Sequence, residues 1–228
     1  MSLFDPVARR YDLLNRLMSF GLDSRWRKRA VAHLKLASGA RVLDAGVGTG
    51  DGLVALAGVA GGVAAAGVDV SARMLRIASA KLGATGGIDA VLALADVCSL
   101  PFADRSFDAV ISFFCVRLLP DRAGFLSSAF RVLKPNGKLV ILELTYPRRP
   151  WVRPLYELHA SVVIPLLGAL LSDDPKAYRL LPRTIRSFPG PGELAALLSD
   201  CGFEDVGYEP LSLGVATIVW GSKRETES

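Results

Sequence analysis

The most informative part of the sequence is a glycine-rich run, Val42-Leu43-Asp44-Ala45-Gly46-Val47-Gly48-Thr49-Gly50-Asp51. Its apolar beginning predicts a buried strand over residues 41–45, and a helix is expected over residues 52–59. Glycine lets the backbone turn sharply and approach a ligand closely, while the next helix points its N-terminus at the same place. The alternate glycines differ from the Gly-x-Gly-x-x-Gly pattern that accommodates a pyrophosphate. The run therefore predicts a ligand-binding turn and disfavours a dinucleotide.

Two further acidic residues stand at the ends of the second and third expected strands. Asp69 is placed to accept hydrogen bonds from both hydroxyls of a ribose. Asp96 is placed to accept one from an adenine amino group, with Val97 beside it as an apolar and backbone contact. Either acid alone could equally be a helix cap or a surface charge. Because three acids stand at successive strand ends, we predict an adenosine site.

Short apolar runs alternate with helix-like segments from residue 40 onward, which is typical of successive βαβ units and a parallel sheet. Ser71 is suited to cap a helix, and Lys134-Pro135-Asn136-Gly137 should end another, with Asn-Gly in a left-handed turn. We expect the third and fourth strands to be buried. The later strands are predicted at 62–70, 90–95, 107–114, 138–144, 206–209 and 215–221, and later helices at 119–132 and 192–199.

Two segments depart from this alternation. Residues 6–20 carry apolar side chains at spacings of three and four and predict an amphipathic helix, within an N-terminal helical segment spanning residues 1–39. Residues 145–188 are interrupted by prolines and carry arginines, which predicts a lid of one to three helices over the sheet edge. The length of 228 residues suits one domain, residues 1–228.

Composition limits the remaining possibilities. Hydrophobic residues make up 51% of the chain and charged residues 21%, as in a packed globule. The three cysteines lie far apart and neither histidine has a ligand-like spacing, so we expect a cytoplasmic protein without a metal site. The longest apolar stretch, residues 160–171, is too short to span a bilayer. Arginine clusters contribute to the net charge of +5, and they either attract phosphate groups or form a solvated helix face.

The glycine turn with its strand-end acids resembles the class I S-adenosylmethionine-dependent methyltransferases. The resemblance implies an α/β, Rossmann-like fold: a mostly parallel seven-stranded sheet with helices on both faces and a helical lid insertion. It also implies S-adenosylmethionine as cofactor, with Asp44 and Asp51 near its cationic methionine portion. The residues expected to bind it are Asp44, Gly46, Gly48, Thr49, Gly50, Asp51, Asp69, Val70, Met74, Asp96, Val97 and Ser112.

Other segments resemble the ubiquinone and menaquinone biosynthesis C-methyltransferase family over nearly the whole chain. The most particular are Arg10-Tyr11-Asp12-Leu13-Leu14-Asn15 and Tyr178-Arg179-Leu180-Leu181. Membership implies methylation of a ring carbon on a demethylated, prenylated quinol, of the demethylmenaquinol or ubiquinone-precursor type. Such chemistry needs alignment and water exclusion but no covalent nucleophile. We therefore expect a cytoplasmic enzyme, peripheral at the inner membrane face, and consider a homodimer.

The segment Val116-Arg117-Leu118-Leu119 resembles the Leu-Arg-Asn motif of that family. The resemblance makes Arg117 a catalytic candidate that stabilises a phenolate or orients a proton-accepting water. Its alternative role is a salt bridge to Asp121 or another acid. Leu118 replaces the family asparagine and cannot form a hydrogen bond. Tyr11 is a second catalytic candidate, and the expected substrate contacts are Tyr178, Phe113 and Leu118.

Two other functions remain open. One is a methyltransferase on the same scaffold with a different small acceptor, a phenol or heterocycle, which the leucine at position 118 motivates. The other is a binding or scaffold protein that keeps the cofactor without catalysis. Nucleic-acid methylation is disfavoured, because amino-group methylators of bases usually carry an Asn/Asp-Pro-Pro-aromatic element where this chain has Ser112-Phe113-Phe114-Cys115.

Overall fold

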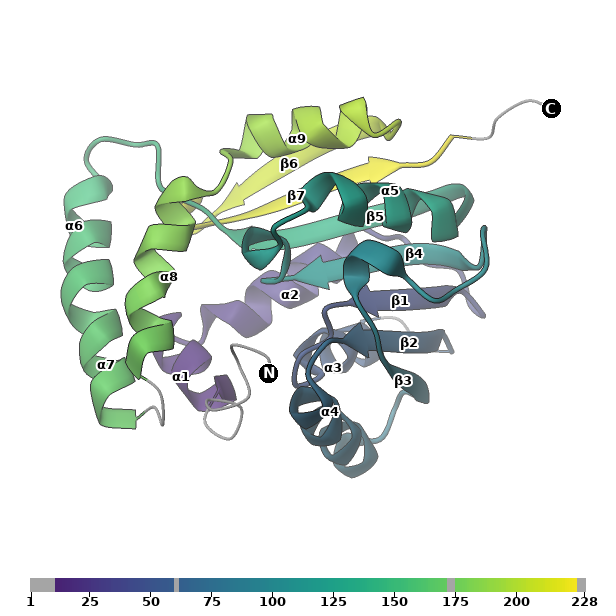
Figure 1. Cartoon of the computed structure of the whole chain (residues 1–228), viewed down its shortest axis with the longest axis horizontal. Helices are drawn as coiled ribbons and strands as arrows, with labels where there is room; N and C mark the ends of the chain where they lie inside the picture. Colours follow the sequence, from purple (N-terminus) through teal and green to yellow (C-terminus); the bar gives the residue numbers. More distant parts are fainter. Residues whose placement is uncertain (1–10, 60–61, 172–174, 225–228) are drawn as a thin grey trace.

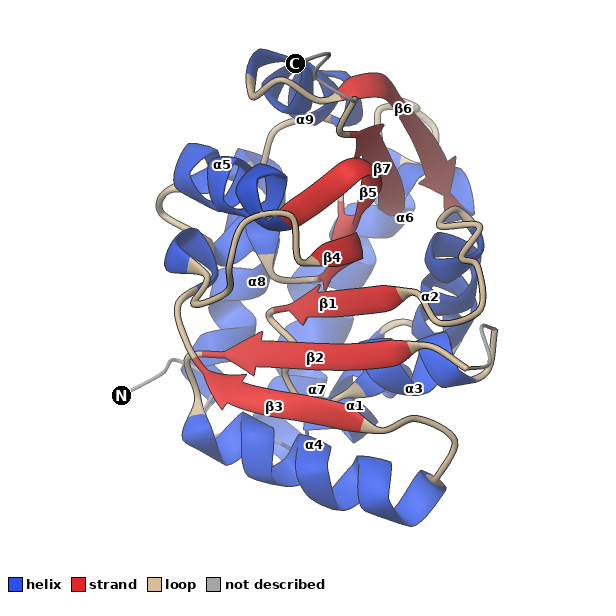
Figure 2. Ribbon diagram, turned by 90° about the vertical axis from the view of Figure 1, so that its right-hand side faces the viewer, coloured by secondary structure: helices blue, strands red, loops and turns tan. Residues whose placement is uncertain are grey.

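A computed structural model describes residues 11–59, 62–171 and 175–224 of the chain. Within these residues, seven strands form one sheet in the order β3-β2-β1-β4-β5-β7-β6 (Figures 1 and 2). The pairs from β3 to β5 are parallel, while β7 runs antiparallel to β5 and to β6. The strands are β1 Arg41–Ala45, β2 Ala64–Asp69, β3 Ala90–Leu94, β4 Phe107–Phe113, β5 Leu133–Leu144, β6 Glu204–Leu211 and β7 Ala216–Ser222.

Helices cover both faces of this sheet, as predicted (Figure 2). Successive side chains of a strand point to opposite faces, so Val110 packs with α5 and α9 while Ile111 packs with α2 and α3. The helices are α1 Tyr11–Met18, α2 Leu22–Ala32, α3 Asp51–Ala57, α4 Ala72–Thr85, α5 Arg122–Val132, α6 Arg153–Leu158, α7 Ile164–Leu171, α8 Pro175–Ser187 and α9 Pro191–Asp200. Short turns are η1 Val97–Ser99, η2 Val116–Leu118, the π-helical η3 His159–Val163 and η4 Ser212–Gly214.

Most predicted elements are confirmed, some with shifted ends. The first strand has the predicted bounds, and Ser71 caps α4 by accepting a hydrogen bond from the backbone N–H of Met74 at 3.1 Å. Asn136 is left-handed, with φ of 63°. However, α5 already ends at Val132 and β5 begins at the next residue, so the predicted stop lies inside the strand.

The predicted burial of the third strand is wrong. Val91 is 73% exposed and Leu94 is 63% exposed. The cause is topological, because β3 lies at one edge of the described sheet and pairs with β2 alone. Apolar side chains on an edge strand can remain in contact with solvent. Most of the fourth strand is buried, as predicted.

The predicted helical lid is confirmed between β5 and α9. The elements α6, η3 and α7 follow one another without a break over residues 153–171, and α8 packs against α7. Figure 1 shows these helices beyond the carboxyl ends of the parallel strands, with α1 beside α7. The predicted helix at 6–20 is described from residue 11, where α1 begins. The lid and α1 therefore border the edge of the sheet that carries the glycine turn.

Candidate functional site

The glycine run forms a tight loop between β1 and α3. The backbone N–H groups of Gly46 and Val47 both donate to the carbonyl of Val68, each at 2.9 Å. Gly46 has φ of 88°, and a Cβ there would collide with the Cys115 side chain. A residue with a side chain is therefore excluded at position 46 by both backbone conformation and space.

A cavity of about 80 Å³ lies against this loop. Nine predicted site residues line it: Asp44, Gly46, Gly48, Thr49, Asp51, Asp69, Met74, Phe113 and Leu118. The other lining residues are Arg27, Val47, Gly52, Phe114 and Cys115.

Asp44 is the buried acid of this cavity. Its side-chain Oδ1 has no hydrogen-bond partner among the described residues, and only 2% of the residue is exposed. Burial raises the pKa of this carboxyl group to about 7, and the nearby carboxylates of Asp69 and Asp51 act in the same direction. A buried acid that lacks a partner is suited to accept a cationic hydrogen-bond donor.

Arg27 on α2 supplies positive charge on the same cavity. Its guanidinium contacts Asp23 at 2.5 Å and Asp51 at 3.8 Å, and it lies over the Phe114 ring. This charge lowers the pKa of Asp44, against the effect of burial. Sequence analysis missed Arg27 as a site residue. No local sequence pattern indicates this role, because Arg27 reaches the cavity from α2 and contacts Asp51 of a distant segment.

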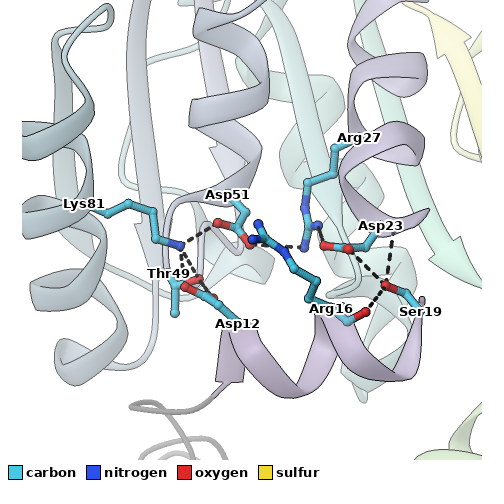
Figure 3. A network of polar contacts seen from close by, with 8 residues as sticks. All are labelled: Asp12, Arg16, Ser19, Asp23, Arg27, Thr49, Asp51 and Lys81. Atoms are coloured by element: carbon cyan, nitrogen blue, oxygen red, sulfur yellow. Dashed lines mark hydrogen bonds and ion pairs between the residues drawn. The ribbon is translucent and has the colours of Figure 1, made fainter. Parts of the chain in front are cut away.

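Lys81 joins three elements at the mouth of the loop (Figure 3). Its Nζ lies 2.6 Å from Asp12 on α1, 2.5 Å from Asp51 on α3 and 3.2 Å from the hydroxyl of Thr49. The Thr49 hydroxyl also donates to Asp12 at 2.6 Å. These contacts hold the N-terminal helix against the glycine loop. Neither Lys81 nor Asp12 was predicted as a site residue.

Asp69 faces the glycine loop. Its Oδ2 accepts a hydrogen bond from the backbone N–H of Gly48 at 2.9 Å, and its Oδ1 accepts one from Ser71 at 2.8 Å. Asp96 instead caps η1 by accepting from the backbone N–H of Cys98 at 2.9 Å, and Val97 is buried in the core. Neither Asp96 nor Val97 lines the described cavity.

Three other predicted cofactor contacts lie near the cavity without lining it. The Ser112 hydroxyl is buried and donates to the carbonyl of Ala45 at 2.7 Å, which joins β4 to β1. Gly50 precedes α3 and faces Ala78 of α4. Val70 is 60% exposed beyond the end of β2. In the structure, Ser112 therefore links two strands by a hydrogen bond, and Gly50 allows α3 and α4 to approach closely.

Arg117 is buried beside the cavity but does not line it. Its backbone N–H donates to Glu143 Oε2 at 2.8 Å, its Nε lies 3.6 Å from the same oxygen, and its guanidinium donates to Thr184 of α8 at 2.5 Å. The structure therefore contains the alternative ion pair, with Glu143 as the acid. Asp121 instead caps α5. The side chains of Tyr11 and Tyr178 lie outside the described residues.

Comparison with known proteins agrees with this geometry. The model of the ubiE/COQ5 methyltransferase family matches residues 1–223. A "Ubiquinone/menaquinone biosynthesis C-methyltransferase UbiE" of Syntrophotalea carbinolica is 42% identical over 222 residues, covering 97% of this chain and 92% of the relative. A "Demethylmenaquinone methyltransferase" of Thermus thermophilus is 41% identical over 221 residues, covering 97% of this chain and 100% of the relative.

Solved structures share the fold at lower identity. A methyltransferase of Thermotoga maritima, described as SAM-dependent and a possible histamine N-methyltransferase, has a TM-score of 0.67 at 22% identity, covering 97% of this chain and 98% of its own. A SAM-dependent methyltransferase of Aquifex aeolicus has a TM-score of 0.63 at 20% identity, covering 86% of this chain and 88% of its own. The predicted class I methyltransferase architecture is thereby confirmed.

Proposed function

This chain belongs to the ubiE/COQ5 methyltransferase family, and on that premise we propose that it transfers a methyl group from S-adenosylmethionine to a ring carbon of a demethylated quinol. The observation that carries the proposal is about 40% identity over nearly full length to relatives named for quinone methylation. The acceptor is a demethylmenaquinol or a ubiquinone precursor.

The residues around the glycine loop fit S-adenosylmethionine. The unpartnered, buried carboxylate of Asp44 suits the cationic amino group of the methionine portion, and the guanidinium of Arg27 suits its carboxylate. Asp69, held against the loop by Gly48, suits the ribose hydroxyls. When bound, the sulfonium supplies an electrophilic methyl group.

The acceptor side of the cavity is apolar. Phe113, Phe114 and Leu118 line it, so an aromatic ring can pack there while water is excluded. Alignment of the ring carbon in line with the methyl–sulfur bond would let the new carbon–carbon bond form as that bond breaks, with S-adenosylhomocysteine leaving and the ring proton released to solvent, so no covalent nucleophile is needed. The protein's contribution is alignment in a dry cavity.

We assign Arg117 a positioning role in this reaction. Its pairing with Glu143 fixes η2, which carries Leu118 into the cavity, and its contact with Thr184 ties η2 to the lid helix α8. Direct stabilisation of a phenolate would require the guanidinium to turn from Thr184 toward the cavity. Removing either member of a buried pair leaves an uncompensated charge, which costs about 3–5 kcal/mol.

A second acceptor class is favoured by one observation. Leu118 lines the cavity without any hydrogen-bonding group where the family resemblance implies asparagine. A soluble phenol or heterocycle that makes only apolar contacts there is the corresponding alternative substrate.

A panel assay tests the proposal. Purified protein is incubated with labelled S-adenosylmethionine and demethylated quinols of short and long tail, alongside soluble phenols and heterocycles. Chromatography should show a ring-methylated quinol as the main product. Turnover restricted to the soluble phenols or heterocycles would reject the quinol acceptor in favour of the alternative.

A further inference from the structure

The outer face of the lid carries a row of large exposed apolar side chains, which we name the lid stripe. It consists of Trp151, Leu155, Leu158, Val162, Leu166 and Leu170. Each is between 51% and 70% exposed. Single exposed apolar residues are ordinary on a protein surface, but a contiguous row marks an interaction site.

Helical periodicity places the lid stripe on one side. Its members follow one another at spacings of four or three along α6, η3 and α7, which run continuously from residue 153 to 171. The opposite side is buried, where Tyr156, Ala160 and Ile164 pack inward. The continuous helical segment α6–η3–α7 is therefore apolar on both sides, although only one side has a partner within the described chain.

Basic residues precede the lid stripe, and most of its length carries no charge. Arg148 and Arg149 are exposed just before it, and the Arg149 guanidinium lies 6.0 Å from the Trp151 ring. The sequence has no Asp, Glu, Lys or Arg from residue 158 to 171. Glu157 forms an ion pair with Arg186 and accepts a hydrogen bond from the Tyr146 hydroxyl.

We propose that the lid stripe lies in the surface plane of an anionic lipid bilayer, with Arg148 and Arg149 against the headgroup phosphates. An apolar helix face with basic residues and tryptophan at its end is suited to the boundary between headgroups and acyl chains. A second copy of the chain is the competing occupant. It fits less well, because two copies that each carry a net charge of +5 repel one another.

The apolar surface continues toward the cofactor loop. Phe20, just after α1, is 76% exposed, and its ring centroid lies 5.4 Å from that of His159, the first residue of η3. The helix α1 in turn contacts the glycine loop through Asp12. A bilayer at this face would place a tailed acceptor beside the catalytic cavity. That purpose rests on the proposed function, whereas bilayer binding itself does not.

Vesicle co-sedimentation of the full-length protein tests the inference. Two vesicle types are compared, phosphatidylcholine alone and phosphatidylcholine mixed with phosphatidylglycerol. The variant Leu158→Glu/Leu166→Glu puts two charges on the lid stripe and should weaken binding at least about tenfold. Its matched control, Val59→Glu/Val91→Glu, makes the same charge change at positions that are 45% and 73% exposed elsewhere, and it should bind nearly as the unmodified protein.

The arginines are tested separately. Arg148→Gln/Arg149→Gln should reduce the preference for phosphatidylglycerol about tenfold or more, and added salt should reduce it in the unmodified protein. The inference is overturned if the unmodified protein binds neither vesicle, or if the lid variant binds like its control. It is also overturned if sedimentation velocity shows a dimer that the lid variant dissociates, because the stripe is then a subunit interface.

The two proposals can fail independently. Methylation is measured on a short-tailed quinol in solution, without vesicles. If vesicles bind but no demethylated quinol is methylated, the proposed acceptor is wrong and the bilayer contact stands. If the soluble quinol is methylated and the lid stripe variant still binds vesicles, only the bilayer inference fails.

Discussion

Gly52 lies so close to Asp44 that a Cβ at position 52 would collide with the Asp44 carboxylate. The first turn of α3 thus leaves space for a buried acid at the end of β1. The absence of a side chain at position 52 is a condition for the acid at position 44, although the two residues belong to different elements. This relationship makes the cofactor loop sensitive to the addition of a single methyl group.

Gly52→Ala should therefore impair cofactor binding more than folding. The added methyl displaces the Asp44 carboxylate, so the dissociation constant for S-adenosylmethionine should rise at least about tenfold, equivalent to about 1.4 kcal/mol. Calorimetric titration measures it. Gly83→Ala is the control, because nothing lies within 4 Å of its added Cβ, and alanine there should stabilise α4 by about 0.5–1 kcal/mol. Equal affinities of the two variants would contradict the prediction.

Asp44→Asn should stabilise the ligand-free protein at alkaline pH. The folded-state pKa of Asp44 is raised by burial to about 7 from the ordinary aspartate value of 3.8. Ionisation therefore costs stability progressively as pH rises from about 4 to 7, and the cost reaches roughly 4 kcal/mol above that range. Asparagine does not ionise. Urea unfolding should show a stability gain of the variant that is about 2–3 kcal/mol larger at pH 8 than at pH 5. A pH-independent difference would show that Asp44 titrates normally.

Cofactor affinity should depend on the same titration. In the proposed site the carboxylate form of Asp44 accepts the cationic amino group, whereas the protonated form predominates below about pH 7. The dissociation constant of S-adenosylmethionine should therefore increase by up to about tenfold per pH unit as pH falls below 7. Titrations from pH 5.5 to 8.5 check this. Asp44→Asn should bind weakly at every pH, and a persisting slope in that variant would assign the titration to another group.

Lys81→Met should loosen the N-terminal helix from the cofactor loop. Lys81 binds Asp12 and Asp51 and is about one-fifth exposed, so its loss should cost about 1 kcal/mol of cofactor binding. We expect KM for S-adenosylmethionine to rise about fivefold with little change in kcat. Arg76→Met is the matched control, since Arg76 is exposed on the same helix and its Nε donates to the carbonyl of Ala72 within that helix. Identical KM values for both variants would show that the contact is dispensable.

The sequence was most informative where local chemistry determines structure. The glycine loop, the Ser71 cap and the bounds of β1 follow from residues close together in the chain. Arg27 and Lys81 could not be assigned this way, because they reach the loop from α2 and α4 through contacts between distant segments. The partner of Arg117 was open for the same reason, since Glu143 lies on a neighbouring strand 26 residues away.

Position 118, where leucine stands in place of the family asparagine, allows a direct test of the substrate class. Leu118 shares the cavity with Phe113, Phe114 and Cys115. An asparagine amide placed among these side chains would lack a strong hydrogen-bond partner and cost about 1–3 kcal/mol. Leu118→Asn should therefore lower kcat/KM for a demethylated quinol about tenfold or more, while Leu118→Met, which keeps the apolar volume, should change it little. The steady-state rates of both variants are compared with thermal melting to confirm folding. If the asparagine variant instead gains quinol activity, the chain is adapted to a different acceptor, because the amide then supplies a contact that the quinol needs and leucine cannot make.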